Sequence, residues 1–267
     1  MIKLEGNILK MRTVINNPVD YYLRIGADEI YMNELLGKTL SFAYQHKINC
    51  IHCGRKTRTS FAQGYCYPCF QSLPETDACI IRPELCQAHL GISRDQDWAE
   101  KNCLQDHIVY LALSSALKVG VTRQSQVPTR WIDQGAWKAI KLAKTPNRNL
   151  AGQIEVALKA HLTDKTNWRH MLTNKLKDGV DMLNEKQRIK ELIPEQLQQY
   201  YIDEDEITEL DFPVNEYPAK VKSLGFDKQA EFEGTLTGIK GQYLLFEGGF
   251  VINIRKHAGY LVEMAWE

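Results

Sequence analysis

Cys50-Ile-His-Cys53 and Cys66-Tyr-Pro-Cys69 are two Cys-x-x-Cys pairs separated by twelve residues. Each pair places two thiolates on one tight turn, and two such turns that face each other complete a tetrahedral cage of four sulfur ligands. Four protein ligands leave no open coordination position, so the spacing predicts a structural zinc ion rather than a catalytic one. The alternative is four unrelated buried thiols.

All seven cysteines of this 267-residue chain lie between Cys50 and Cys103. The chain begins Met1-Ile-Lys-Leu-Glu-Gly, which has no uninterrupted apolar stretch and does not match a secretory signal. In the reducing cytoplasm, thiols serve as metal ligands or stay free rather than form disulfides. No apolar run reaches the ~20 residues of a membrane-spanning helix. We therefore expect a cytoplasmic protein with a metal-bearing module and no membrane partner.

A second structural zinc ion is predicted from the remaining cysteines and two histidines. The preferred ligands are Cys86, His89, Cys103 and His107, because they form two short-spaced pairs, with Cys79 as the alternate ligand. The other interpretation is that these cysteines are small buried hydrophobic residues and the histidines are ordinary surface groups.

Charge is distributed unevenly along a chain whose 33 basic and 33 acidic residues balance overall. Residues 107–177 carry twelve Lys and Arg side chains against three acidic ones, whereas residues 178–267 carry nine against eighteen. A basic middle beside an acidic end indicates a phosphate-rich partner for the middle. The acidic segment around Asp203-Glu-Asp-Glu206 would dock on that face when no nucleic acid is bound, or the two segments neutralise each other within one folded surface.

Apolar patterns and turn residues on either side of the cysteine pairs predict strands toward both ends of the chain and an α/β unit in its middle. Strands are predicted at 7–11, 20–25, 39–44, 107–113, 117–121, 136–143, 232–239, 243–246, 250–255 and 260–264. Helices are predicted from Pro128 to before Gly135, over 149–162 and within 178–200, with an acidic linker at 203–211.

The middle unit resembles the GIY-YIG endonuclease superfamily in the order of four features, Ile108-Val-Tyr110, Lys118-Val-Gly120-Val-Thr122, Arg130 and Glu155. In that superfamily two antiparallel strands carry the two name-giving motifs, a following helix carries an arginine and a later helix carries a metal-binding glutamate. Tyr110 stands at the tyrosine of the first motif. Lys118 stands where the second motif has its own tyrosine. Several phage-type branches of the superfamily likewise have lysine at this position.

The resemblance implies a role for each of these residues in phosphodiester cleavage. Glu155 would hold Mg²⁺ or Mn²⁺, and Tyr110 would act as, or orient, the general base. Arg130 would bind the scissile phosphate, with Lys118 and Arg123 as further contacts to DNA or RNA.

Each of these residues also has an interpretation without catalysis. Tyr110 in an apolar strand is commonly a core aromatic residue with its hydroxyl at the edge. Arg130 and Lys118 are then solvated surface charges. Glu155 faces water or pairs with Lys159 at spacing four. Trp131 is expected to be a core residue.

The expected fold class is α+β, with a β-rich N-terminal zinc-ribbon module, a central GIY-YIG-like α/β unit and a small C-terminal antiparallel β meander or barrel. The order of these parts is similar to that of a bacterial family of domains of unknown function. The likeness of Glu5-Gly-Asn-Ile-Leu to Glu233-Gly-Thr-Leu-Thr leaves open that both ends share one sheet. The predicted segments are 1–49 (β-rich), 50–106 (zinc module), 107–177 (GIY-YIG-like), 178–211 (helical and acidic connector) and 212–267 (β module).

Three functions follow from these features. The first is a nucleic-acid-acting zinc protein with a GIY-YIG-like core, acting as a Mg²⁺-dependent endonuclease. The second is a non-catalytic DNA- or RNA-binding protein on a nuclease-derived fold, since zinc modules and basic units are both frequent in such proteins. The third is a zinc-stabilised scaffold whose basic middle binds an acidic protein.

Overall fold

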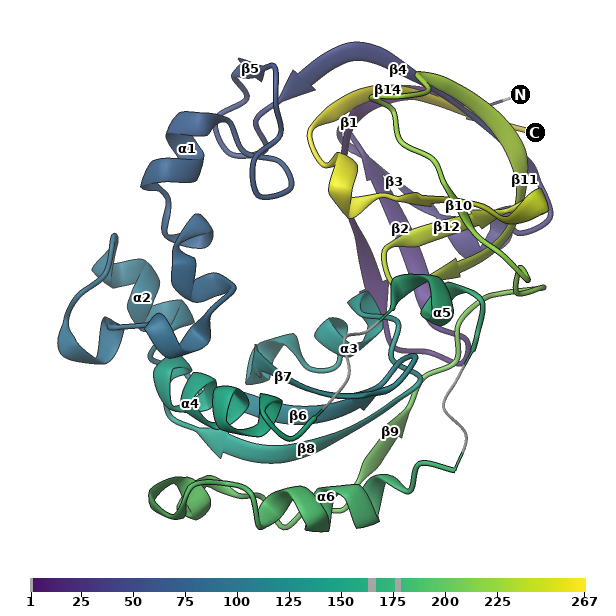
Figure 1. The fold of residues 1–267 in the computed structure, drawn as a ribbon. Coiled ribbons are helices and arrows are strands. Elements are labelled where there is room, and N and C mark those ends of the chain that lie inside the picture. The colour runs from purple at the N-terminus through teal and green to yellow at the C-terminus, as the bar shows by residue number, and fades with distance from the viewer. Residues whose placement is uncertain (1, 163–166, 176–178) are drawn as a thin grey trace.

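The computed structural model describes residues 2–162, 167–175 and 179–267 of the chain. Two sheets dominate this part of the chain, and a cysteine-rich helical segment runs from one to the other (Figure 1). The prediction of an α+β fold is confirmed at this level. Within the described ranges, no helix is both long enough and apolar enough to span a membrane. The predicted boundary between residues 177 and 178 lies outside the described residues.

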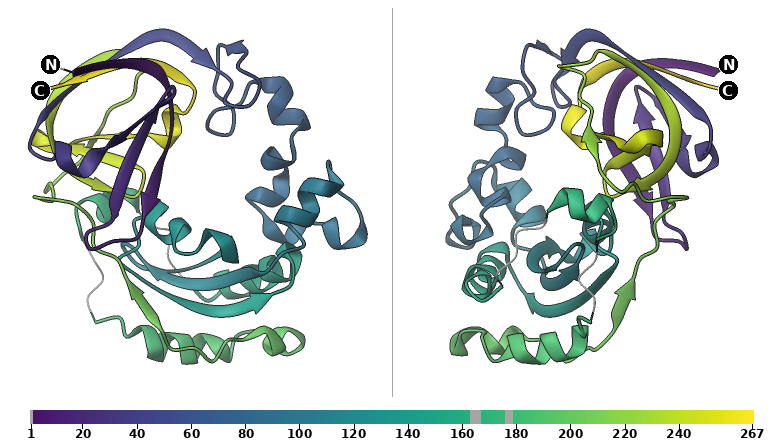
Figure 2. Two further views of the ribbon diagram at one scale, coloured as in Figure 1. Left: turned by 180° about the vertical axis from the view of Figure 1, so that it is seen from behind. Right: turned by 45° about the vertical axis from the view of Figure 1, so that its right-hand side comes forward.

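The larger sheet is built by both ends of the chain. Its described strands are β1 (Ile2–Val14), β2 (Asp20–Ile25), β3 (Asp28–Tyr31), β4 (Thr39–Asn49), β5 (Lys56–Thr57), β10 (Lys222–Ser223), β11 (Glu231–Lys240), β12 (Tyr243–Phe246), β13 (Phe250–Asn253) and β14 (Tyr260–Trp266). They follow the order β10-β13-β12-β11-β4-β14-β1-β2-β3, and β5 pairs with the end of β4. The sheet curls round on itself, and the two ends of the chain lie side by side in every view (Figures 1 and 2).

The segments 1–49 and 212–267, predicted as two modules, therefore form one sheet. β14 pairs antiparallel with β1 on one side and with β4 on the other, and β4 pairs in turn with β11. The inner face of this curled sheet holds an aromatic cluster in which Phe42 of β4 stacks on Phe232 of β11 with ring centroids 5.0 Å apart. Phe42 is buried, so N- and C-terminal residues share one hydrophobic core.

The smaller sheet has the strands predicted for the α/β unit and one more. Its order is β7-β6-β8-β9, and neighbouring strands run antiparallel; the strands are β6 (His107–Leu113), β7 (Leu117–Arg123), β8 (Lys138–Thr145) and β9 (Ile207–Glu209). Every residue of β6 is buried, because both faces of the sheet are covered. The segment predicted as a linker at 203–211 therefore contains a strand, β9, on the edge of this sheet.

Different elements cover the two faces of the smaller sheet. On one face, the buried side chains of β6 join the core of the curled sheet together with Trp131 of α3 (Thr129–Asp133), as expected for that tryptophan. On the other face, they pack against Ile154 of α4 (Arg148–Lys159) and Ile189 of α6 (Met182–Lys190). The helix predicted over 149–162 is present as α4 but ends earlier, at Lys159.

The acidic stretch after α6 neutralises part of the basic segment. Lys141 of β8 forms an ion pair with Glu204 at 3.1 Å, and Lys138 forms one with Glu209 at 2.7 Å. Lys186 of α6, whose side chain is fully buried, reaches Asp205 at 3.4 Å. The pairs of Lys141 and Lys138, both on β8, agree with the interpretation that acidic and basic segments neutralise each other.

The cysteine-rich segment between β4 and β6 consists of short helices and turns. Its α-helices are α1 (Tyr67–Ser72) and α2 (Gln96–Asn102), and α5 (Trp168–Leu172) lies further along the chain. The described 3-10 helices are η1 (Met32–Leu35), η2 (Pro74–Thr76), η3 (Ala78–Ile80), η4 (Pro83–Leu85), η5 (Ala88–Leu90), η6 (Gln124–Gln126), η7 (Glu195–Tyr200), η8 (Glu247–Gly249) and η9 (Arg255–His257).

The cysteine-rich segment touches the smaller sheet through a close approach of η4 to α4. A Cβ atom added to Gly152 of α4 would lie 2.1 Å from the backbone nitrogen of Glu84 and 2.4 Å from the carbonyl carbon of Pro83. Asn149, one turn earlier on α4, donates a hydrogen bond of 2.8 Å to the carbonyl oxygen of Glu84. Only glycine allows the two backbones to approach this closely.

We expect Gly152→Ala to destabilise the protein although alanine favours helices. The added methyl group meets backbone rather than a movable side chain, so η4 and α4 must separate, at a cost of roughly 1–3 kcal/mol. Urea unfolding of the full chain measures this cost as a lower midpoint. Val156→Ala, at an exposed position of the same helix, is the matched control and should change the unfolding free energy by less than about 0.5 kcal/mol. An unchanged midpoint for Gly152→Ala would contradict the contact.

Candidate functional site

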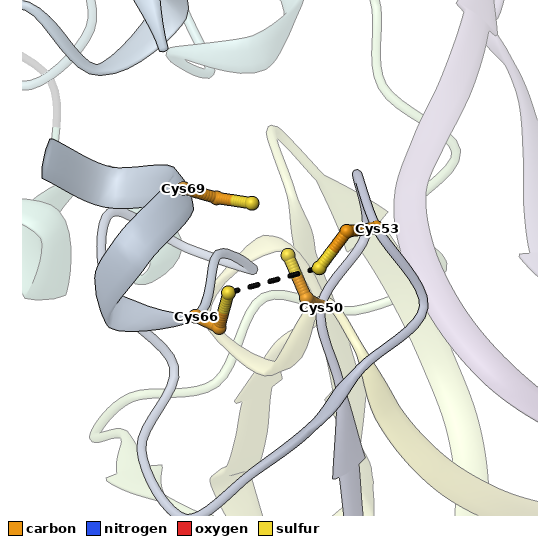
Figure 3. A group of neighbouring side chains, drawn as sticks. All are labelled: Cys50, Cys53, Cys66 and Cys69. Carbon is orange, nitrogen blue, oxygen red and sulfur yellow. Dashed lines mark hydrogen bonds between the residues drawn. The ribbon is translucent and has the colours of Figure 1, made fainter. Parts of the chain in front are cut away.

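Four cysteines converge beside the end of the curled sheet (Figure 3). Cys50 follows β4 directly, and the turn between β4 and β5 contains Cys53. Cys66 is the N-cap residue of α1, and Cys69 lies within that helix. The first pair is therefore carried by a hairpin and the second by a helix start.

The four sulfur atoms stand at distances suited to zinc. All lie within 4.8 Å of one another, and the Sγ atoms of Cys53 and Cys66 are 3.7 Å apart. Zinc–thiolate bonds of about 2.3 Å in a tetrahedron place sulfur atoms about 3.8 Å apart, whereas a disulfide requires about 2.05 Å. All seven cysteines are free thiols. The donor set fits a zinc ion with four protein ligands.

The protein environment of this group favours a thiolate at Cys50. Burial raises the pKa of Cys50, but backbone N–H groups of Cys53, Cys66 and His52 outweigh it and lower the pKa to about 6. Hydrogen bonds from backbone N–H groups stabilise the charged sulfur. Burial and hydrogen bonds with the other three thiols raise the pKa of Cys69 to about 12, so Cys50 ionises before Cys69 when no cation is bound.

The other three cysteines form a second group. The Sγ atoms of Cys79, Cys86 and Cys103 lie within 4.8 Å of one another, and all three residues are buried. The prediction had preferred His89 and kept Cys79 as the alternate. The structure instead places Cys79 with Cys86 and Cys103. Both predicted histidines, His89 and His107, lie outside this group, and His89 is exposed. His107, also in the predicted set, is buried at the start of β6.

A central cleft of about 650 Å³ lies between the curled sheet, the cysteine-rich segment and the smaller sheet. It is lined by residues from all three parts of the chain, including β1, η2, η4, β7, α3 and α4. The charged residues that line it are Lys10, Arg24, Glu75, Asp77, Arg130, Glu155 and Arg255. Asp77 pairs with Arg94 at 2.9 Å, and Glu155 pairs with Lys159, so two of the three carboxylates already have a cation.

Several residues predicted from the GIY-YIG resemblance line this cleft together. They are Tyr110, Gly120, Arg130 and Glu155. Lys118 and Arg123 do not line the cleft. Burial, and then the charge of Arg130, lower the pKa of Lys118 to about 8. Arg123 donates a hydrogen bond to the side chain of Asn102 in the cysteine-rich segment.

The tyrosine of the first motif and the glycine of the second lie directly opposite each other. Tyr110 on β6 pairs with Gly120 on β7. A Cβ atom at Gly120 would lie 2.6 Å from the hydroxyl oxygen of Tyr110, so any other residue would displace the ring. This explains physically why a tyrosine and a glycine occur together in this pair of strands.

Tyr110 is fully buried and forms the floor of the cleft behind Gly120. Its hydroxyl donates a hydrogen bond of 3.0 Å to Oε1 of Gln134, which also lines the cleft. Burial raises the pKa of Tyr110, with the charge of Arg130 opposing it. The hydroxyl therefore stays protonated near neutral pH. This state suits an orienting role and disfavours the role of general base.

Glu155 is buried on the face of α4 that meets the cleft. Burial raises its pKa, and the ion pair with Lys159 at 3.2 Å opposes that shift. The pairing with Lys159 proposed from sequence spacing is thus present. Arg130, half-buried at the cleft, also lowers the pKa of Glu155, so opposite charges face each other in this part of the site.

Sequence reasoning did not include Arg255, which follows β13 in η9, among the site residues, although the polar segment 253–257 is able to add contacts at a strand end. It lines the cleft and makes no ion pair within the described ranges. Burial, and then the charge of Arg130, lower the pKa of Arg255, so the two guanidinium groups are close enough to repel each other. Its neighbour Lys256 is exposed. The segment Arg255-Lys-His257 resembles a solvated loop end in sequence, and only the curl of the sheet turns Arg255 inward.

A family model with the description "Protein of unknown function (DUF2797)" matches residues 37–262. No curated protein and no solved structure matches the chain.

We expect the group of Cys50, Cys53, Cys66 and Cys69 to hold one zinc ion that stabilises the fold. Cys66→Ser should lower the zinc content of the purified chain by one ion and lower its thermal midpoint, because metal binding contributes folding energy. Elemental analysis and thermal unfolding measure the two effects. His52→Ala, an exposed non-ligand in the first turn, is the control and should keep the metal. A Cys66→Ser protein with wild-type zinc and midpoint would contradict the site.

Proposed function

The chain belongs to the DUF2797 family of proteins of unknown function, and we propose that it is a nucleic-acid-acting protein that cleaves phosphodiester bonds at a GIY-YIG-like site. One observation carries this proposal. Tyr110, Gly120, Arg130 and Glu155, whose order along the chain resembles that superfamily, all line one cleft. They come from two strands and two helices, so a packing need within one element does not account for the grouping.

The charges around the cleft favour a phosphate group. Arg130 and Arg255 face the same space, and neither forms an ion pair with a carboxylate of the described residues. Two guanidinium groups that face one cleft attract an anion, and guanidinium geometry matches phosphate oxygens. On the opposite side of the smaller sheet, Lys138 and Lys141 are neutralised by acidic partners. Arg130 and Arg255 therefore supply positive charge to the cleft that no carboxylate of the described residues neutralises in an ion pair.

Glu155 is the residue that would hold a divalent cation in this cleft. Mg²⁺ is commonly bound by one or two carboxylates together with water and phosphate oxygens, so a single protein carboxylate fits. Such an ion would offset negative charge on the phosphate and lower the pKa of a bound water molecule. In the described part of the chain, no group of three or more metal-ligating side chains includes Glu155, so the phosphate itself would complete the site.

Side chains of the cleft would position the scissile phosphate for hydrolysis. Arg130 and Arg255 would bind the non-bridging oxygens of the scissile phosphate, where negative charge increases as water attacks phosphorus. In this hydrolysis a new phosphorus–oxygen bond forms to water, the bond to the leaving oxygen breaks, and the proton of the water passes to solvent or to the leaving oxygen. Tyr110 acts as a positioning residue, since its hydroxyl holds Gln134 at the floor of the cleft.

The four-cysteine zinc group holds in place a segment that forms part of the cleft wall. The segment that follows Cys53 and precedes Cys66 contributes Gln63 and Tyr65 to the cleft wall. We propose a zinc-ribbon-like module that holds this wall in place, in a cytoplasmic protein that keeps its seven thiols reduced. A cleft of this volume accommodates a nucleotide-sized part of a longer nucleic acid.

We expect the purified chain to cleave a nucleic acid in the presence of Mg²⁺ or Mn²⁺. Single-stranded DNA, duplex DNA and structured RNA are incubated with the protein, and binding is read by gel shift in parallel. Glu155→Gln should reduce cleavage at least about 100-fold while binding is retained, because the carboxylate acts on the cation rather than on affinity. Arg130→Ala should weaken both, since it contacts the phosphate.

The outcomes of this assay separate the candidate functions. Metal-dependent cleavage that disappears in Glu155→Gln supports the endonuclease. Binding without cleavage by the wild-type chain contradicts it and identifies a binding protein on a related fold. Absence of both, together with binding of an acidic protein, contradicts nucleic-acid action altogether.

We further expect Arg255→Ala to reduce nucleic-acid binding by roughly 10-fold and to flatten its salt dependence. Removal of one phosphate contact lowers the slope of log affinity against log salt by about 0.7–0.9. Lys256→Ala removes the same charge from an exposed neighbouring position and is the matched control, with a smaller effect on affinity. Equal losses in the two variants would show that Arg255 acts only through general charge.

A further inference from the structure

We propose that Cys79, Cys86, Cys103 and His107 form a second, closed zinc site, distinct from the site of the four other cysteines. The seven cysteines of the chain divide into a group of four and a group of three. A tetrahedral structural site needs four ligands. The second group is therefore one ligand short. The ring nitrogens of His107 do not lie within 4.8 Å of all three sulfur atoms, so the proposal requires the buried imidazole of His107 to move toward them when zinc binds.

His107 has the hydrogen bonding of a zinc ligand without the metal. Its Nδ1 lies 2.7 Å from the carbonyl oxygen of Gln105, so Nδ1 carries the proton and donates it. Nε2 then presents a lone pair, and this atom is buried with no hydrogen-bond partner. Metal-bound histidines commonly donate their other N–H to a carbonyl in this way. A buried acceptor without a partner is otherwise costly, because it loses its water and gains nothing.

The charge of the surroundings fits this ligand set. Arg148 is buried and donates hydrogen bonds to the carbonyl oxygens of Cys79 at 3.4 Å and Asn102 at 3.1 Å. Among the described residues no carboxylate forms an ion pair with it. A buried guanidinium needs a negative partner. Zn²⁺ with three thiolates and a neutral imidazole has one net negative charge, which Arg148 balances.

A water molecule is the competing fourth ligand. The three cysteines border a cavity of about 320 Å³, so solvent has room on that side. Water in the fourth position would make an open zinc site but would leave Nε2 of His107 buried without a partner. Coordination by His107 satisfies that atom and also ties the cysteine-rich segment to the first strand of the smaller sheet, close to the contact of η4 with α4.

X-ray absorption at the zinc edge tests the ligand set in the unmodified full chain. The proposal requires two zinc ions per chain and, over both sites together, seven sulfur ligands and one imidazole nitrogen. One zinc per chain, or seven sulfur ligands with an oxygen and no imidazole scattering, would overturn it. This measurement does not depend on the folding of any variant.

Two histidine variants complete the test by separating His107 from His89. After dialysis against a chelator, His107→Ala should retain one zinc instead of two, and His89→Ala, at an exposed position of the cysteine-rich segment, should retain both. His107→Cys should restore the second metal and, with Co²⁺ in place of zinc, move the absorption bands to longer wavelength, since thiolate is a weaker-field ligand than imidazole. Two zinc ions in His107→Ala, or loss of one in His89→Ala, would refute the assignment.

Discussion

The backbone pairing of β4 holds this molecule together. β4 lies between β14 and β11, so its hydrogen bonds join the first third of the chain to the last. The same strand runs directly into Cys50 and pairs at its end with β5. Displacement of β4 would therefore disrupt the core of the curled sheet and the first pair of zinc ligands at once. The cysteine-rich segment connects this strand to α4, and η4 packs closely against α4 at Gly152.

The cleft forms because the cysteine-rich segment lies between the curled sheet and the smaller sheet and leaves a space among the three. The curled sheet supplies Lys10 and Arg255, the cysteine-rich segment supplies Glu75, and the smaller sheet with its helices supplies Arg130 and Glu155. α3 is fixed against the curled sheet by Asp133, which pairs with Lys10 at 2.5 Å and accepts a hydrogen bond of 2.9 Å from Gln242. These polar contacts of the buried Asp133 side chain orient the helix that carries Arg130. The charge of the cleft thus depends on docking between parts rather than on any one part.

Local patterns in the sequence predict much of this structure. The features that depend on pairing between distant parts of the chain could not be predicted. The Cys-x-x-Cys spacing and the four-residue apolar repeat of α4 depend on neighbouring residues, so the first zinc group and that helix are readable from sequence. The grouping of Cys79 with Cys86 and Cys103 depends on how several short helices pack, and spacing favoured His89 instead. The union of β1 with β14 and the inward turn of Arg255 depend on partners more than 200 residues apart in the chain, such as Ile2 and Trp266. No local rule reports such partners.

The pairing of β1 and β4 with β14 also has a consequence for how the protein is made. The ribosome delivers β1 and β4 early and β14 near the end of the chain. Synthesis at ~5–20 residues per second leaves the edges of these strands without their partner for on the order of 10–40 s. An unpaired strand edge with an apolar face is a template for association with other chains. Translation speed and chaperone access therefore contribute, beside equilibrium stability, to how much of the newly made chain reaches this fold.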